Sequence, residues 1–289
     1  MKWIVLAVLV LVLVLVAVTA AAVTYGHLRW NRLTAALFER LDVARAPLHP
    51  ARVDLREIDG LPAPVQRYFR AVLQDGAPMV VGATVEHRGT FNMAADIGAP
   101  KWKPFTSHQR VVTRRPGFVW DGRVAMLPGL AVHVHDAYVG GEGILHAAIA
   151  GLLTLADLRG TDDVALGELM RFFAEAAWYP TALLPSQGVQ WHAVDERSAR
   201  ATLRDGPRAS TLQFFFGEDG LITAVRAEAR GRTVGDAVIP TPWEGRWSSH
   251  QRRDGMLVPV DGEVAWLLPA GARPYWRGTI TTLRYEFAR

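Results

Sequence analysis

The chain has 289 residues, of which 50% are hydrophobic and 21% charged, so it can bury one substantial core and does not have the composition of a disordered chain. It contains no cysteine, which excludes disulfides, thiolate metal sites and the lipid-modified cysteine of a bacterial lipoprotein. The net charge of +4 is spread along the chain without a Lys/Arg cluster, which argues against nucleic-acid binding.

The N-terminal segment is dominated by an apolar run over residues 4–23. Twenty residues of helix span about 30 Å, the hydrocarbon thickness of a bilayer. Trp3 before the run, and Tyr25 and Trp30 after it, sit where interfacial aromatic residues occur. The run therefore predicts a membrane protein with a single-pass transmembrane anchor over 1–25. A cleaved signal peptide, giving a secreted domain, is the alternative, because a basic residue precedes the run and small residues end it.

Residues 26–60 are predicted to hold a juxtamembrane helix and a linker. Leu33, Leu37 and Leu41 recur every four residues, as on one face of an amphipathic helix. An anchor with so short an N-terminal head enters the membrane as a signal does, so the globular domain is predicted to be extracytoplasmic. The arginines that follow the run favour the opposite, cytoplasmic placement.

Residues 61–289 are predicted to form one β-rich globular domain that begins with a helix over 65–74. Apolar and polar residues alternate from residue 79 onward, and Gly-containing hairpin turns separate later strand-like runs. The predicted fold is mainly β with a few helices, an antiparallel meander forming a barrel or half-barrel. Further predicted strands cover 107–113, 117–126, 130–139, 189–194, 199–204, 209–216, 221–230, 243–252, 256–267 and 275–287.

One helix is predicted to interrupt the strands near 163–178. Asp162 or Asp163 is expected to cap it, and apolar residues recur at helical spacing behind the cap. Residues 144–158 fit either a helix or a long buried strand, and the strand-rich context favours the strand.

His133 and His135 are the strongest metal-ligand candidates, because residues two apart on a strand share a face. A third ligand would have to come from elsewhere, so a strand showing its polar side to water is the preferred interpretation and no metal is predicted.

Glu175 is a weak catalytic candidate, since Trp178 lies one turn away and an indole raises the pKa of a neighbouring carboxyl. An ion pair with Arg171, four residues earlier on the same helix, is the preferred interpretation. The sequence contains none of the common hydrolase motifs, so an enzyme is unsupported and no cofactor is predicted.

Tryptophan is unusually frequent, and most copies fall in or beside predicted strands. Ordinary core packing explains such residues, but a concave lining for an apolar ligand is the functional alternative. The preferred hypothesis is a membrane-tethered domain that binds an apolar small molecule or membrane lipid without catalysis. The rival hypotheses are a hydrolase using Glu175 with a His or Asp partner, and an envelope scaffold that binds another protein. The candidate lining residues are Trp102, Trp120, Trp178, Trp191, Trp243 and Trp266.

Six motifs are spread over residues 60–287: Leu61-Pro62-x-Pro64-Val65-Gln66-x-Tyr68, Pro116-x-Phe118-Val119-Trp120-Asp121, Asp136-x-Tyr138-x-x-Gly141-x-Gly143, Glu175-x-x-Trp178-Tyr179-Pro180-Thr181-Ala182-Leu183-Leu184, Pro242-Trp243-x-Gly245 and Gly262-Glu263-Val264-Ala265-Trp266. Through these motifs the region resembles a bacterial family of domains of unknown function that carry an N-terminal membrane anchor. The resemblance implies no established activity, and its strand pattern is similar to the half-barrels of lipoprotein-carrier proteins at the level of the fold only.

Overall fold

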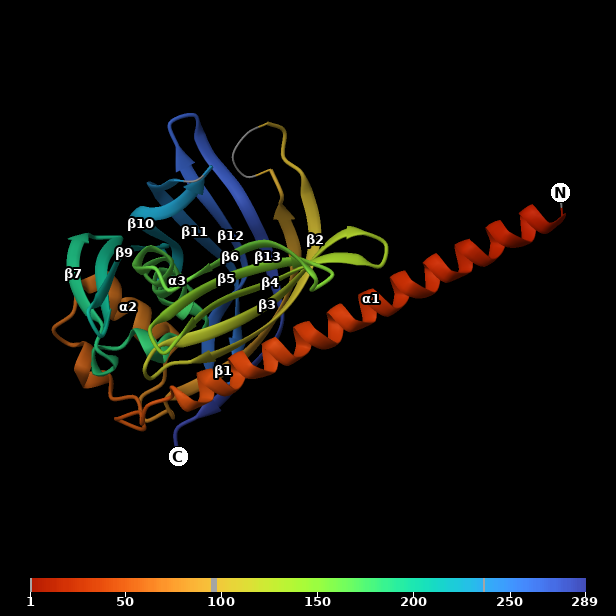
Figure 1. Cartoon of the computed structure of the whole chain (residues 1–289). Helices are drawn as coiled ribbons and strands as arrows, with labels where there is room; N and C mark the ends of the chain where they lie inside the picture. Colours follow the sequence, from red (N-terminus) through yellow and green to blue (C-terminus); the bar gives the residue numbers. More distant parts are fainter. Residues whose placement is uncertain (1, 95–97, 236) are drawn as a thin grey trace.

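One antiparallel sheet makes up most of the computed structural model, which describes residues 2–94, 98–235 and 237–289 (Figure 1). Within those residues the sheet has thirteen strands in the order β6-β5-β4-β3-β2-β1-β13-β12-β11-β10-β9-β8-β7. The strands are β1 (Val80–Asn92), β2 (Trp102–Val112), β3 (Gly117–Leu127), β4 (Leu130–Val139), β5 (Glu142–Ile149), β6 (Leu153–Arg159), β7 (Gln190–Asp195), β8 (Ser198–Asp205), β9 (Arg208–Phe216), β10 (Ile222–Val234), β11 (Ala237–Arg253), β12 (Met256–Leu268) and β13 (Gly271–Phe287).

The sheet consists of two meanders, β1 to β6 and β7 to β13, joined where β1 pairs with β13. It curves into a half-barrel that leaves β6 and β7 as free edges, which confirms the predicted fold class. The connection between these edges contains α3, which lies inside the curve (Figure 1). The helical segments are α1 (Lys2–Val43), η1 (Leu55–Ile58), α2 (Ala63–Val72), α3 (Asp162–Glu175), η2 (Ala176–Trp178), η3 (Pro180–Leu183) and η4 (Pro185–Gln187).

The ambiguous segment 144–158 is a hairpin and not one long strand or a helix. Ala150 and Gly151 take positive φ values of 51° and 70°, which reverses the chain between β5 and β6. β6 is then an edge strand with mostly exposed side chains, so the expected burial holds for β5 alone.

α3 occupies the predicted position, but its cap differs from the prediction. The hydroxyl oxygen of Thr161 accepts a hydrogen bond from the backbone N–H of Val164, with 3.4 Å between the two atoms. Thr161 is therefore the capping residue, and neither Asp162 nor Asp163 is. Both aspartates lie in the first turn, where negative charge is favourable beside the helix N-terminus. The helix continues into η2, which carries Trp178.

The predicted anchor and juxtamembrane helix form one continuous helix, α1. Its N-terminal half is exposed, while Gly26, Trp30, Leu37 and Leu41 are buried against the outer face of the sheet. The prediction that Trp30 is an interfacial aromatic residue is therefore wrong, because its side chain is buried against the sheet. Among the described residues, one helix, α1, is long and apolar enough to cross a membrane. The segment predicted as a linker also packs on the domain, where Ile58 in η1 is fully buried.

Candidate functional site

The concave face of the half-barrel holds a cavity of about 990 Å³. Strands β3 to β6 form one wall, β10 to β13 form the opposite wall, and α3 closes the base between them. Because side chains alternate between the two faces of a strand, the lining residues of β3, β4 and β5 are an even number of positions apart. Trp120 and Val124 of β3, for example, face the cavity.

Four of the six predicted lining tryptophans border this cavity: Trp120, Trp178, Trp243 and Trp266. Trp178 is almost fully buried, at 2% exposure. Trp243 donates its indole N–H to the hydroxyl of Tyr275 at 2.9 Å. The structure thus brings residues from β3, η2, β11 and β12 to one aromatic surface.

Trp102 and Trp191 lie elsewhere. The guanidinium of Arg277 stacks over Trp102 at 4.5 Å, away from the cavity lining. Trp191 packs against Phe214 with ring centroids 5.1 Å apart and donates to the carbonyl of Leu183, so it is a core residue.

Trp247 and Trp276 line the cavity as well, although they are absent from the predicted set. A repeated Trp-x-Gly spacing identifies Trp276, which precedes Gly278 as Trp243 precedes Gly245. Trp247 has no such glycine and no comparable local signal. Residues two apart share a face of the strand, and a Cβ on Gly278 would meet the ring of Trp276. The indole therefore lies flat over the glycine, which keeps the cavity open.

A charged cluster centred on Arg171 of α3 lies at the base of the cavity. Its guanidinium pairs with Asp136 of β4 and, at 2.8 Å, with Glu175. The other carboxylate oxygen of Glu175 accepts a hydrogen bond from Gln109 at 2.7 Å. The predicted Arg171–Glu175 pair is confirmed, and Gln109 is a second partner of Glu175.

Glu168 completes the cluster. It lies 3.8 Å from Arg230, whose guanidinium also stacks over Trp243 at 5.2 Å. Burial and the nearby carboxylate of Asp136 raise the pKa of Glu168 well above its ordinary value. Arg171 and Arg230 thus lie among three acidic side chains, those of Asp136, Glu168 and Glu175.

His133 and His135 lie on the opposite, outer face of β4, and the interpretation that they face water is wrong. Both are buried under α1, at 0% and 1% exposure. The ring of Trp30 stacks on His135 with centroids 4.0 Å apart, and Thr34 Oγ1 lies 2.7 Å from His135 Nε2. Burial lowers the pKa of each histidine to about 4. The described residues contain no group of three His, Cys, Asp or Glu placed to hold a metal ion.

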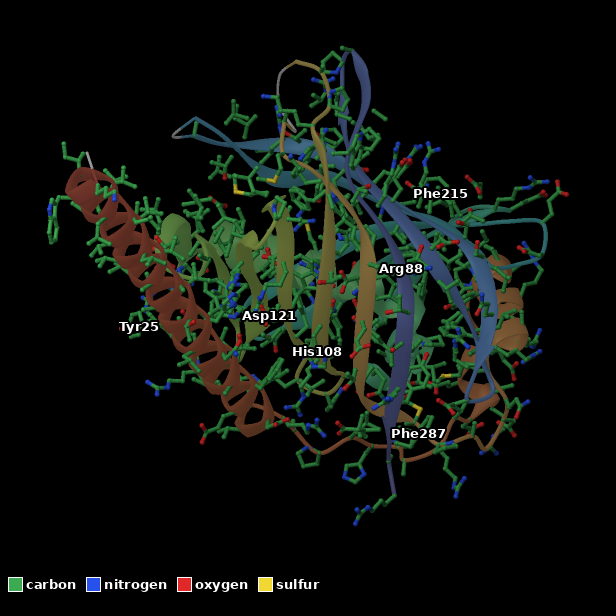
Figure 2. All side chains as sticks on the ribbon, turned by 90° about the vertical axis from the view of Figure 1, so that its right-hand side faces the viewer. Tyr25, Arg88, His108, Asp121, Phe215 and Phe287 are labelled. Atoms are coloured by element: carbon green, nitrogen blue, oxygen red, sulfur yellow. The ribbon has the colours of Figure 1, made fainter. Side chains whose placement is uncertain are left out.

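Trp30 connects this histidine cluster to β3. Its indole N–H donates to Asp121 Oδ1 at 2.9 Å, and the guanidinium of Arg123 lies over its ring. Figure 2 shows α1 running along the outer face beside the strand that carries Asp121. The cluster is thus a docking contact for the helix.

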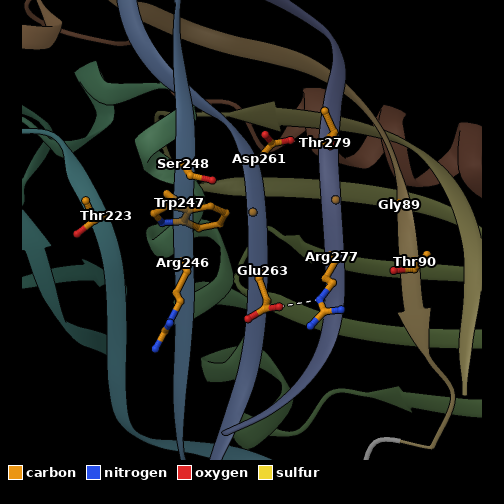
Figure 3. A pocket seen from close by; sticks show the side chains of 12 residues that line it. Gly89, Thr90, Thr223, Arg246, Trp247, Ser248, Asp261, Glu263, Arg277 and Thr279 are labelled. Carbon is orange, nitrogen blue, oxygen red and sulfur yellow. Dashed lines mark hydrogen bonds and ion pairs between the residues drawn. The ribbon is translucent and has the colours of Figure 1, made fainter. Parts of the chain in front are cut away.

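A second hollow of about 570 Å³ is lined mainly by polar residues of β11, β12 and β13, with contributions from β1 and β10 (Figure 3). Glu263 and Arg277 form an ion pair across it at 2.6 Å. Its paired charges distinguish it from the aromatic cavity, although Trp247 borders both.

A model described as a family of unknown function (DUF6920) matches residues 59–285. The chain belongs to this family. Membership in DUF6920 confirms the resemblance inferred from the motifs. No curated protein matched the sequence.

Solved structures of similar fold share little sequence with this DUF6920 member. A LolA superfamily protein from Nitrosomonas europaea matches with a TM-score of 0.40 and 9% identity, over 78% of this chain and 92% of that one. A putative outer membrane lipoprotein-sorting protein domain from Vibrio parahaemolyticus matches with a TM-score of 0.33 and 6% identity, over 81% and 92%.

Proposed function

We propose that this protein is a membrane-tethered domain that binds an apolar or lipid-like ligand in the concave cavity, without catalysis. The observation that carries the proposal is the cavity of about 990 Å³ walled by tryptophans. Ligand pockets commonly measure about 300–1,000 Å³ and combine apolar walls with a few polar groups. This cavity has both, since the Arg171 cluster lies at its base.

The charges at the base favour a ligand that is uncharged where it lies deepest. Arg171 already contacts two carboxylates, and Arg230 has Glu168 beside it. A charged ligand group placed there would lose its hydration and upset this balance. An acyl chain fits these surroundings, with any polar head group at the rim.

The ligand test is mass spectrometry of organic extracts from natively purified full-length protein. Ala147 lines the cavity, so Ala147→Phe fills part of it, whereas Ala193 of β7 is exposed and Ala193→Phe is the matched control. We expect an apolar molecule at near-stoichiometric amount from the wild type and the control, and its loss from Ala147→Phe. Equal extracts from all three proteins, or an empty wild type, would contradict the proposal.

The second part of the proposal concerns the membrane anchor. Residues 1–25 stay attached and cross the membrane, residues 26–60 join this anchor to the globular domain, and residues 61–289 form that domain. The exposed apolar half of α1 supports this. The intact mass of membrane-extracted protein is expected to include the apolar run. A mature form that begins near Ala21 in the soluble fraction would show a cleaved signal instead.

The domain is proposed to be extracytoplasmic. A reporter fused after Arg289 is expected to be active only in a form that works outside the cytoplasm. Strong signal from a cytoplasm-only reporter at the same junction would reverse the topology, in line with the arginines that follow the apolar run.

A further inference from the structure

The position of the domain relative to α1 is fixed by close backbone packing. Gly26 of α1 lies against the turn between β5 and β6, where a Cβ would come within 2.8 Å of the Leu152 side chain. A Cβ on Gly151 would lie 2.7 Å from the Gly26 carbonyl oxygen. Arg29 donates to the Gly151 carbonyl at 3.0 Å. The helix and the half-barrel therefore meet at one defined angle.

This contact coincides with the end of the apolar run. Residues 4–23 are almost entirely exposed, and burial against the sheet begins at Gly26. A bilayer that holds the apolar run would have its surface close to Gly26, at the level of the β5–β6 turn. Along β4, His135 lies at Trp30 and His133 at His27, so the β3–β4 hairpin points toward the apolar run (Figure 1).

Large apolar side chains are exposed at this same level. Leu127, at the end of β3, is 67% exposed, and Leu153, at the start of β6, is 63% exposed. Leu155 on β6 is 53% exposed and also lines the cavity. Exposed leucines gathered at one end of a sheet are typical of a surface that contacts a membrane or another protein.

The cavity reaches the same end of the sheet. The antiparallel order places the ends of β1, β3, β5, β10 and β12 together. Three residues at this end line the cavity. Met93 follows β1, Gly235 follows β10, and Val238 lies at the start of β11.

We propose that this end of the half-barrel rests on the leaflet that α1 enters, with Leu127 and Leu153 inserted among the lipids. The cavity mouth then opens onto the bilayer, and a lipid acyl chain passes into it without crossing water. This inference rests on the proposed function for the anchor and the ligand. It adds the surface from which the ligand is taken, a lipid bilayer.

Site-specific probes test the contact, because the absence of native cysteine lets a single introduced thiol be labelled. Bimane is attached to Leu127→Cys, Leu153→Cys and, as a control, Val194→Cys on the distant edge strand β7, where the native side chain is 44% exposed. The full chain is reconstituted in phosphatidylcholine/phosphatidylglycerol vesicles that carry acyl-chain quenchers. We expect emission at the first two positions to fall about twofold, as for side chains inserted at the headgroup boundary, and emission at the control to be unchanged. Equal quenching at all three positions would overturn the proposal.

A second copy of the chain is the competing partner for the same leucines. Bifunctional maleimide crosslinks through Leu127→Cys in dilute detergent solution would show that the protein itself covers this face, and would overturn membrane contact. Monomers in detergent together with quenching in vesicles support it.

A second experiment tests whether the ligand enters the cavity directly from the bilayer, which we call the lateral route. Leu127→Asp with Leu153→Asp is expected to slow loading of NBD-labelled stearate from vesicles about tenfold, because both side chains leave the lipid phase. Neither leucine lines the cavity, so affinity for the same probe in detergent stays unchanged, and Val194→Asp behaves as wild type. Unchanged loading overturns the lateral route. Failure to bind the probe in detergent refutes the proposed ligand binding instead, and bimane quenching reports contact independently of either result.

Discussion

Gly262 tests whether glycines position the tryptophan side chains that line the cavity. It lies in β12 opposite Trp247 of β11, and an added Cβ would come 2.6 Å from Cζ3 of Trp247 and 3.2 Å from Cζ3 of Trp276. Carbon atoms rest about 3.5–4.0 Å apart, so Gly262→Ala must move the Trp247 ring by about 1 Å. Trp178 limits that movement, because its ring centroid is 5.2 Å away. We expect a loss of about 1–3 kcal/mol in the free energy of unfolding.

Ligand affinity is expected to fall too. If the displaced ring excludes about two methylene groups, at about 0.8 kcal/mol each, affinity for NBD-labelled stearate drops by about tenfold. Urea unfolding and fluorescence titration of the full chain in detergent measure the two effects. Gly60→Ala is the matched control, since nothing lies within 4 Å of that site. If Gly262→Ala matched Gly60→Ala in both assays, the argument that glycines hold the indoles flat would be refuted.

Three further changes test the base of the cavity and the helix contact. Trp178→Ala is expected to cost about 3–5 kcal/mol of unfolding free energy, as for a buried large-to-small change, and a near-neutral urea midpoint would contradict this. Glu175→Gln is expected to cost about 3 kcal/mol, because its ion pair with Arg171 is buried; loss of a measurable turnover with an intact fold would instead support an enzyme. Burial lowers the pKa values of His133 and His135 from 6.5 to about 4, so their stabilising contribution is complete above pH 6.5 and is lost as pH falls toward 4. Hydrogen exchange in the C-terminal half of α1 is expected to quicken over that range, and a flat profile would remove the histidines from the docking contact.

The strand pattern was predictable because almost all pairing in this sheet is local. Each strand of a meander pairs with its neighbour in sequence, so alternation and glycine turns determine both the strands and their order. Gly255 and Gly271, for instance, have positive φ values of 85° and 112° at predicted turns. The pairing of β1 with β13, almost 200 residues apart, has no such local signal. The sequence therefore predicted a barrel or half-barrel without deciding between them.

The candidate site was predictable only in part, for a similar reason. The Arg171–Glu175 pair follows from helical spacing alone. Arg230 enters the same cluster from β10, and no local pattern connects it to α3. Trp30 was misassigned because an aromatic residue beyond an apolar run fits a membrane interface, whereas its partner Asp121 lies 91 residues away.

The α1 contact and the cavity are built on the same strands, and this explains why the residues of β3 and β4 alternate as they do. Trp120 lines the cavity while Asp121, on the other face, binds Trp30. Val134 faces the cavity and His135 faces α1. A slip of one residue in strand register would exchange the two faces, placing histidines in the aromatic wall and a tryptophan under the helix. The register of these strands therefore fixes the cavity and the orientation of α1 together.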